Sequence, residues 1–158
     1  MRLLIVRHAE AVPAAAAGVP DAERPLTRYG EYVFRAAARE LARRVPAPEV
    51  LLASPLLRAQ QTAAFLSEAW GVAVTAEPAL ASGSVETILE ALTDHANRDT
   101  VAIVGHEPTV SGLLGELVGG DVRGFSPGAA ALVETSAVSA HDGRLLWFLP
   151  AEAPPSSP

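Results

Sequence analysis

Four residues suited to phosphate chemistry follow short apolar runs of the sequence. Arg7 and His8 directly follow the first run, and Arg58 lies shortly after the second. His106 follows the fourth such run by one residue. Guanidinium groups bind phosphoryl oxygens in pairs, and a neutral imidazole can attack phosphorus or hydrogen-bond the developing charge. If these runs are adjacent strands, the four side chains predict an anion site that contains a nucleophile.

The apolar runs alternate with helical patterns, which is typical of an α/β domain. The expected strands are residues 2–7, 50–53, 72–76, 100–104, 130–138 and 145–149, and the expected helices are residues 28–45, 54–70, 84–95 and 108–118. We expect a mostly parallel sheet with helices on both faces, and an antiparallel edge formed by the last two strands. Ligands of such sheets bind beyond the carboxyl ends of the strands, where the four residues fall.

Helix signals add detail around these strand ends. Thr27 is a plausible N-cap of the first long helix, and Ser54 followed by Pro55 is expected to open the second. The N–H groups of helix N-termini at two of the strand exits favour a bound anion. Residues 10–25 read as a long loop of the kind that is often functional.

Composition excludes several classes of protein. The chain has 158 residues, a net charge of −6 and no cysteine, so thiol catalysis, thiolate zinc sites and disulfides are excluded. A global electrostatic grip on nucleic acid or on a membrane is not expected. No targeting segment is recognised, and a cytoplasmic protein is expected. We expect one domain over residues 1–149 and a disordered Pro/Ser-rich tail over residues 150–158.

Four blocks in order resemble the histidine phosphatase superfamily, which has the phosphoglycerate-mutase-like fold. They are Arg7-His8, Leu26-Thr27-x-x-Gly30, Ser54-Pro55-x-x-Arg58-Ala59-x-x-Thr62-Ala63 and Gly105-His106-x-Pro108. The short length, residues 24–27 and residues 54–62 are most similar to the SixA-type phosphohistidine phosphatases. The resemblance covers the chain to about residue 149. It implies a three-layer α/β/α sandwich.

The resemblance also implies a role for each matching residue. His8 would be the phosphorylated nucleophile, Arg7 and Arg58 would bind the phosphoryl oxygens, and His106 would be the second histidine of the pocket. Arg24 matches an additional basic residue near the pocket, although it could instead pair with Asp21 or Glu23 in a solvated loop. No metal and no other cofactor is implied.

Two positions depart from the family pattern. Ala9 stands where the family usually has glycine, and no clear catalytic carboxylate follows the third strand. Glu86 and Glu10 are the candidate general acids, although Glu10 could equally orient Arg7 or be a plain loop carboxylate. An imidazole leaving group, with a pKa near 6.5, needs less help from an acid than an alkoxide does. The lack of a clear catalytic carboxylate therefore favours phosphohistidine over phosphate esters as the substrate.

We accordingly expect a phosphatase that works through a phosphohistidine intermediate and removes phosphate from phosphohistidine on a protein. A small-molecule phosphomonoesterase, acting on a sugar or nucleotide phosphate, is the alternative. A phosphate- or phosphoprotein-binding module that does not turn over its ligand is the second alternative. The partner is thus a phosphorylated protein or metabolite, and the chain is expected to work as a monomer or small homo-oligomer.

Overall fold

A computed structural model describes residues 1–120 and 123–154 and contains one mixed six-stranded sheet. The strand order is β3-β2-β4-β1-β5-β6. The strands are β1 (Arg2–Arg7), β2 (Val50–Ala53), β3 (Val74–Ala76), β4 (Thr100–Gly105), β5 (Ala130–Thr135) and β6 (Gly143–Leu149). The pairs that β1, β2, β3 and β4 form with one another are all parallel. Strands β5 and β6 pair in the antiparallel direction and form the expected antiparallel edge.

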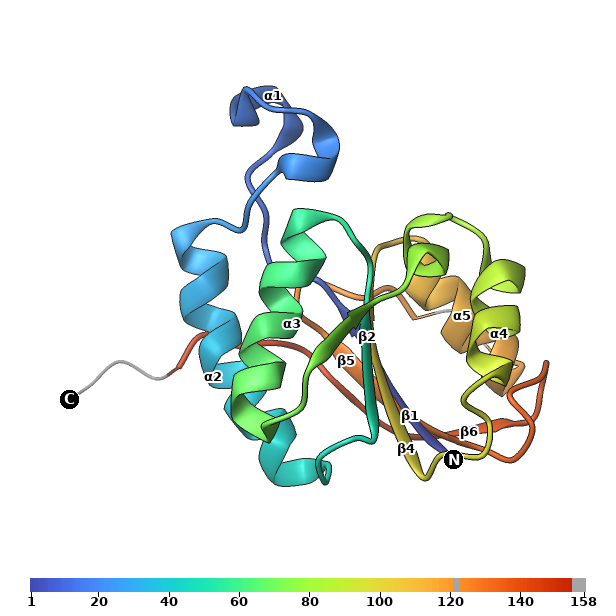
Figure 1. Ribbon diagram of the computed structural model, residues 1–158. Coiled ribbons are helices and arrows are strands. Elements are labelled where there is room, and N and C mark those ends of the chain that lie inside the picture. Colours follow the sequence, from blue (N-terminus) through green and yellow to red (C-terminus); the bar gives the residue numbers. More distant parts are fainter. Residues whose placement is uncertain (121–122, 155–158) are drawn as a thin grey trace.

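Helices cover both faces of this sheet, which confirms the predicted three-layer α/β/α architecture (Figure 1). One face carries α2 (Arg28–Arg44) and α3 (Leu57–Trp70), and the other carries α4 (Val85–Thr93) and α5 (Thr109–Val118). Short turns complete the chain: α1 (Ala14–Ala17), η1 (Asp21–Glu23) and η2 (Pro78–Ala81). The Thr27 hydroxyl caps α2 as predicted, accepting a 2.8 Å hydrogen bond from the Gly30 N–H.

Alternation along β1 divides the core into two parts. Leu3 and Ile5 point into the cluster under α4 and α5, whereas Leu4 and Val6 point into the cluster under α2 and α3. All four side chains are fully buried. Successive residues of a strand face opposite sides of the sheet, so a central strand buried on both faces reads as a continuous apolar run. This packing fixes the position of the residues that follow β1.

Two local expectations are wrong. The loop at residues 10–25 contains α1 and η1, because its alanines and the Pro20-Asp21 start allow short helical turns without a buried face. The helix after β2 begins at Leu57 rather than at Pro55, and Ser54 is not its N-cap. The Ser54 hydroxyl instead accepts a 3.2 Å hydrogen bond from the Leu56 N–H within a turn and contacts His106.

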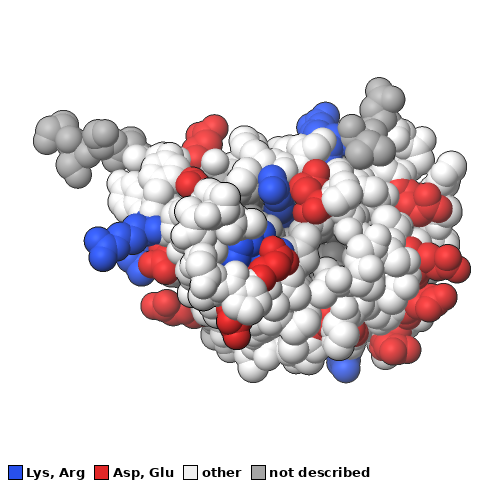
Figure 2. Space-filling view, turned by 90° about the horizontal axis from the view of Figure 1, so that it is seen from above, with Lys and Arg blue, Asp and Glu red and all other residues white. Residues whose placement is uncertain are grey.

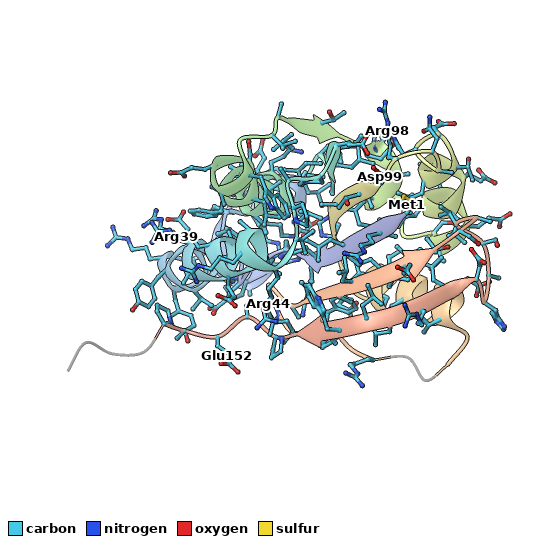
Figure 3. All side chains as sticks on the ribbon, turned by 90° about the horizontal axis from the view of Figure 1, so that it is seen from below. Met1, Arg39, Arg44, Arg98, Asp99 and Glu152 are labelled. Atoms are coloured by element: carbon cyan, nitrogen blue, oxygen red, sulfur yellow. The ribbon has the colours of Figure 1, made fainter. Side chains whose placement is uncertain are left out.

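The amino edge of the sheet lies opposite the predicted site. Seen from this side, Met1, Arg98 and Asp99 lie at the starts of β1 and β4 (Figure 3). Arg39 points outward from α2 and is exposed. No helix within residues 1–120 and 123–154 has the length and apolar character to cross a membrane.

The carboxyl-terminal segment leaves β6 beside α2. Residues 150–154 line a hollow together with side chains of that helix, such as Leu41 and Arg44. Residues 155–158 of the expected tail lie outside the described residues. The domain boundary at residue 149 therefore stays a prediction.

Candidate active site

The strand register brings His8 and His106 together. Arg7 of β1 pairs with Gly105 of the parallel strand β4, so the next residue of each strand leaves the sheet at the same level. The two imidazole centroids lie 5.1 Å apart, with an angle of 56° between the rings. The carboxyl ends of β1 and β4 thus form the centre of the candidate site, as predicted.

The hydrogen bond of His8 defines which of its nitrogen atoms is free to react. Nδ1 lies 2.7 Å from the carbonyl oxygen of Ala9, and a carbonyl can only accept, so Nδ1 carries the hydrogen. The lone pair of the neutral ring is then on Nε2. The Ala9 N–H donates to Thr62 Oγ1 at 3.0 Å, and the Thr62 hydroxyl donates to the Arg58 carbonyl at 2.7 Å. Helix α3 therefore holds the backbone that orients His8.

His106 is held by Ser54. Its Nε2 lies 2.7 Å from Ser54 Oγ. The Ser54 hydroxyl can donate its hydrogen to His106 Nε2 while it accepts from the Leu56 N–H, an arrangement that goes with the tautomer whose hydrogen is on Nδ1. His106 Nδ1 is buried and has no hydrogen-bond partner among the described residues. It can donate to an oxygen atom of a ligand.

Both predicted phosphate-binding arginines are anchored by their ends. Arg7 Nη1 donates to the Phe125 carbonyl at 2.9 Å. Arg58 donates from Nη1 to the Asp21 carbonyl at 2.8 Å and from Nη2 to the Asp21 carboxylate at 3.2 Å. The Nε atoms of both arginines are buried, and neither has a partner among the described residues. The edge of each guanidinium that carries Nε is therefore free for a ligand.

The unpaired nitrogens belong to residues around the two histidines, since the charges of Arg7 and Arg58 lower the pKa of both His8 and His106. Within the described chain, the buried side-chain polar atoms without a partner are Arg7 Nε, Arg58 Nε and His106 Nδ1. Leaving a buried donor unpaired costs about 1–3 kcal/mol, so native proteins rarely do so without a reason. All three come from residues that the sequence assigns to one anion site. An oxyanion with several acceptor oxygens is the kind of ligand that would pair them.

Arg24 contacts Asp21 rather than the two histidines. Its Nε donates to Asp21 Oδ1 at 2.9 Å, and its Nη1 donates to the Val12 carbonyl at 2.8 Å. The expected pairing with Asp21 is thus present, but Arg24 is only 17% exposed and its charge contributes to lowering the pKa of His106, so it also lies near the two histidines. A role of Arg24 in substrate binding stays a prediction. The three-residue spacing of Arg24 and Asp21 was the only signal for their pairing in the sequence. Asp21 in turn contacts Arg58, which sequence reasoning missed because the two residues are 37 positions apart.

Burial keeps both histidines in the neutral form. Desolvation, together with the neighbouring His106, Arg7 and Arg58, lowers the pKa of His8 to about 4, and the hydrogen bond to Ala9 acts in the opposite direction. Desolvation, followed by the charge of Arg58, also lowers the pKa of His106 to about 4. Near pH 7 the Nε2 lone pair of His8 is therefore available without a base to remove a proton.

Neither candidate general acid contacts this centre in the described part of the chain. Glu86 is exposed on the first turn of α4. Glu10 lines a pocket of about 180 Å³ with Tyr29 and Gly128, and this lining includes none of the four central residues. Glu107, next to His106, instead accepts from the N–H and hydroxyl of Ser111 and from the Phe125 N–H.

The described residues offer no ready metal site. Nowhere in residues 1–120 and 123–154 do three or more histidine, aspartate or glutamate side chains gather in a way that could hold a metal ion. The site that the fold assembles is one of guanidinium and imidazole groups. These groups favour an anion as the ligand.

Comparison with known proteins agrees with this geometry. The sequence model of the histidine phosphatase superfamily (branch 1) matches residues 3–84. The chain belongs to this superfamily. Residues 7, 8 and 58 of the candidate site fall within the match, and His106 lies beyond it.

Relatives within the superfamily include phosphohistidine phosphatases. The chain is 33% identical over 127 residues to the phosphohistidine phosphatase SixA of Escherichia coli (strain K12), covering 77% of this chain and 76% of the relative. A structure of the protein histidine phosphatase SixA complexed with tungstate is similar with a TM-score of 0.83 and 29% identity, covering 95% of this chain and 97% of that one.

More distant members share the fold alone. A mycobacterial glucosyl-3-phosphoglycerate phosphatase has a TM-score of 0.73 at 18% identity, with 95% of this chain and 99% of that chain covered. This histidine phosphatase therefore has the common architecture of the superfamily, and its sequence is more similar to the SixA proteins.

Proposed function

We propose that this histidine phosphatase removes phosphate from phosphohistidine on a protein, with His8 as the nucleophile. One observation carries the proposal: a neutral His8 with Nε2 free lies 5.1 Å from the His106 ring, and the charges of Arg7 and Arg58 act on it, while all three neighbours keep a buried, unpaired nitrogen among the described residues. The similarity to SixA supports the choice of phosphohistidine. The tungstate in the related SixA structure supports an oxyanion as the ligand.

In the first step, His8 Nε2 attacks phosphorus in line with the bond to the leaving group. The phosphoryl oxygens accept hydrogen bonds from the Nε edges of Arg7 and Arg58 and from His106 Nδ1. These donors are held by Phe125, Asp21 and Ser54 before the substrate arrives, so little reorganisation is needed in the transition state. The product is phospho-His8 and a free leaving group.

In the second step, water hydrolyses phospho-His8. The same donors stabilise the transferring phosphoryl group, and release of phosphate restores the neutral ring. The carbonyl of Ala9 keeps the hydrogen on Nδ1 throughout, so Nε2 is ready for the next cycle. Neither step requires a proton from Glu10 or Glu86 when the leaving group is an imidazole.

A parallel phosphate-release assay tests the proposal. The substrates are a phosphohistidine peptide, a phosphoserine peptide and several sugar phosphates. We expect kcat/KM to be highest for phosphohistidine, and we expect His8→Ala to lose at least about 10³-fold of it because the nucleophile is removed. His95→Ala, which removes a histidine outside the site, is the matched control and should keep wild-type activity.

Three results would contradict the proposal. Full activity of His8→Ala would exclude His8 as the nucleophile. Faster turnover of the esters would instead indicate a small-molecule phosphomonoesterase with a general acid, and Glu86 and Glu10 would be replaced next. Binding of phosphorylated ligands without turnover of any of them would indicate a binding module.

A further inference from the structure

Asp21 places a fixed carboxylate at the outer side of the phosphate-binding arginines. Its Oδ1 accepts from Arg24 and its Oδ2 from Arg58, and its backbone carbonyl accepts a third hydrogen bond, from Arg58 Nη1. The Arg58 side chain is 8% exposed, whereas that of Asp21 is 63% exposed. The exposed Asp21 carboxylate therefore links the buried guanidinium of Arg58 to the surface of the molecule.

The pictures agree with this placement. The segment with α1 and η1 rises above the carboxyl edge of the sheet (Figure 1). Seen from above this edge, arginine atoms occupy a hollow near the middle of the face, and acidic atoms lie against them (Figure 2). The part of a substrate beyond its phosphoryl group would therefore meet both kinds of charge.

The carboxylate keeps capacity to bind a substrate group. Each of its oxygens accepts one hydrogen bond from the described residues, and a carboxylate offers about four acceptor positions in all. Arg24, followed by Arg58, lowers the pKa of Asp21, so the group is ionised at neutral pH. Its charge also reaches the centre of the site, since it opposes the lowering of the pKa of His106.

A carboxylate in this position affects an imidazole leaving group and an ester differently. When His8 attacks phosphohistidine, the P–N bond breaks and its electron pair goes to the ring nitrogen that held the phosphorus. If the other ring nitrogen carries a hydrogen, the ring leaves as neutral imidazole; without it, the ring would leave as a strongly basic imidazolate. An anionic acceptor favours the protonated ring. A phosphate ester has no such nitrogen.

We propose that Asp21 is a specificity-determining residue that favours substrates whose leaving group is a protonated imidazole ring. Its carboxylate accepts a hydrogen bond from the distal ring N–H of phosphohistidine and repels substrates with a second anionic group beside the phosphate. This inference rests on the proposed function. It goes beyond that function because it assigns the preference for phosphohistidine over phosphate esters to Asp21, which is not one of the four central residues of the site.

The Asp21→Asn variant tests this role, because it removes the charge but keeps the size of the side chain and the backbone carbonyl that holds Arg58. Its kcat/KM is compared with that of the wild type on a phosphohistidine peptide and on p-nitrophenyl phosphate, whose leaving group needs no proton. We expect about a five- to tenfold loss on the peptide, as for a partly exposed charged hydrogen bond, and a clearly smaller loss on the ester, because the Asp21 backbone carbonyl still holds Arg58. Glu23→Gln, an exposed carboxylate of the same turn, is the matched control and should leave both values unchanged.

Inhibition by tungstate reports separately on the anion site. We expect the Asp21→Asn variant to be inhibited by tungstate at about the same concentration as the wild type. Equal losses on both substrates, or a parallel loss of tungstate inhibition, would overturn the inference, because Asp21 would then act only by holding Arg58. Wild-type activity of Asp21→Asn on both substrates would overturn it as well. A wild-type enzyme that does not hydrolyse the phosphohistidine peptide would instead overturn the proposed function, so the two failures are distinguishable.

Discussion

At the scale of single residues, one hydrogen bond decides what each imidazole of the site can do. The Ala9 carbonyl holds the hydrogen of His8 on Nδ1, which leaves the Nε2 lone pair free. Ser54 lies against the opposite nitrogen of His106, Nε2, so Nδ1 is the nitrogen of that ring that has no partner among the described residues. Two chemically identical side chains thus have different capacities because of a carbonyl and a hydroxyl.

The pKa values of these two rings give a testable pH dependence. Burial lowers both to about 4, so we expect the ring signals of His8 and His106 in NMR spectra to titrate together near that pH. His8→Ala should remove one of the two transitions. The folded pKa values lie below the unfolded value of 6.5, so the unfolded chain takes up protons first as the pH falls. The free energy of unfolding should therefore fall as the pH is lowered from about 6.5 to about 4.

In the NMR titration, ring signals of His8 and His106 that change near pH 6.5 would contradict the expected pKa values and would show that the site is open to water.

The sequence predicted which residues form the site better than it predicted their contacts. His8, His106, Arg7 and Arg58 could be found because strand ends meet at one edge of a parallel sheet. The contact of Asp21 with Arg58 depends on how the segment between β1 and α2 folds back, and no periodic pattern encodes this. The role of Ser54 was hidden for a different reason: a serine before proline is also typical of a helix start.

At the scale of secondary-structure elements, register is what places the site. Arg7 pairs with Gly105, and Ala53 pairs with Val104, so β1, β4 and β2 end almost level. The approximate positions of the strands and long helices along the chain could be predicted because their apolar patterns are strong. Their order in the sheet could not be predicted, because no local pattern encodes which strands become neighbours. Short elements such as α1 and η1 bury no apolar side chain, so they left no pattern to read.

The start of α2 offers a test of the packing between elements. Ala normally stabilises a helix by about 0.5–1 kcal/mol relative to Gly. At Gly30, however, an added Cβ would collide with the Glu10 carbonyl, which is also held by the Thr27 N–H. We expect Gly30→Ala to lower the free energy of unfolding by about 1–3 kcal/mol in urea titrations. Gly120→Ala, where an added Cβ has open space, is the control and should change it by less than about 0.5 kcal/mol. A Gly30→Ala protein as stable as the wild type would show that α2 can move away from Glu10.

At the scale of the whole molecule, a positive site is built on a negative protein. The net charge is −6, so long-range attraction does not bring an anionic substrate to the surface. In the proposed function, anion binding depends instead on Arg7 and Arg58, whose guanidinium groups are held by the carbonyls of Phe125 and Asp21. Composition alone could predict that any anion site must be local, and the register of β1 and β4 places the candidate site at the carboxyl ends of these strands.

The most direct test of the central claim is to detect phosphate on His8. Wild-type enzyme in excess is mixed rapidly with a phosphohistidine peptide and quenched in alkali, in which phosphohistidine is stable. The quenched protein is then digested and analysed by mass spectrometry. Transfer to His8 predicts a transient phosphate on the fragment that contains Arg7 and His8, formed no more slowly than inorganic phosphate appears, and no such species in His8→Ala. Release of phosphate without any phosphorylated His8, or a phosphate found on another residue, would contradict the account.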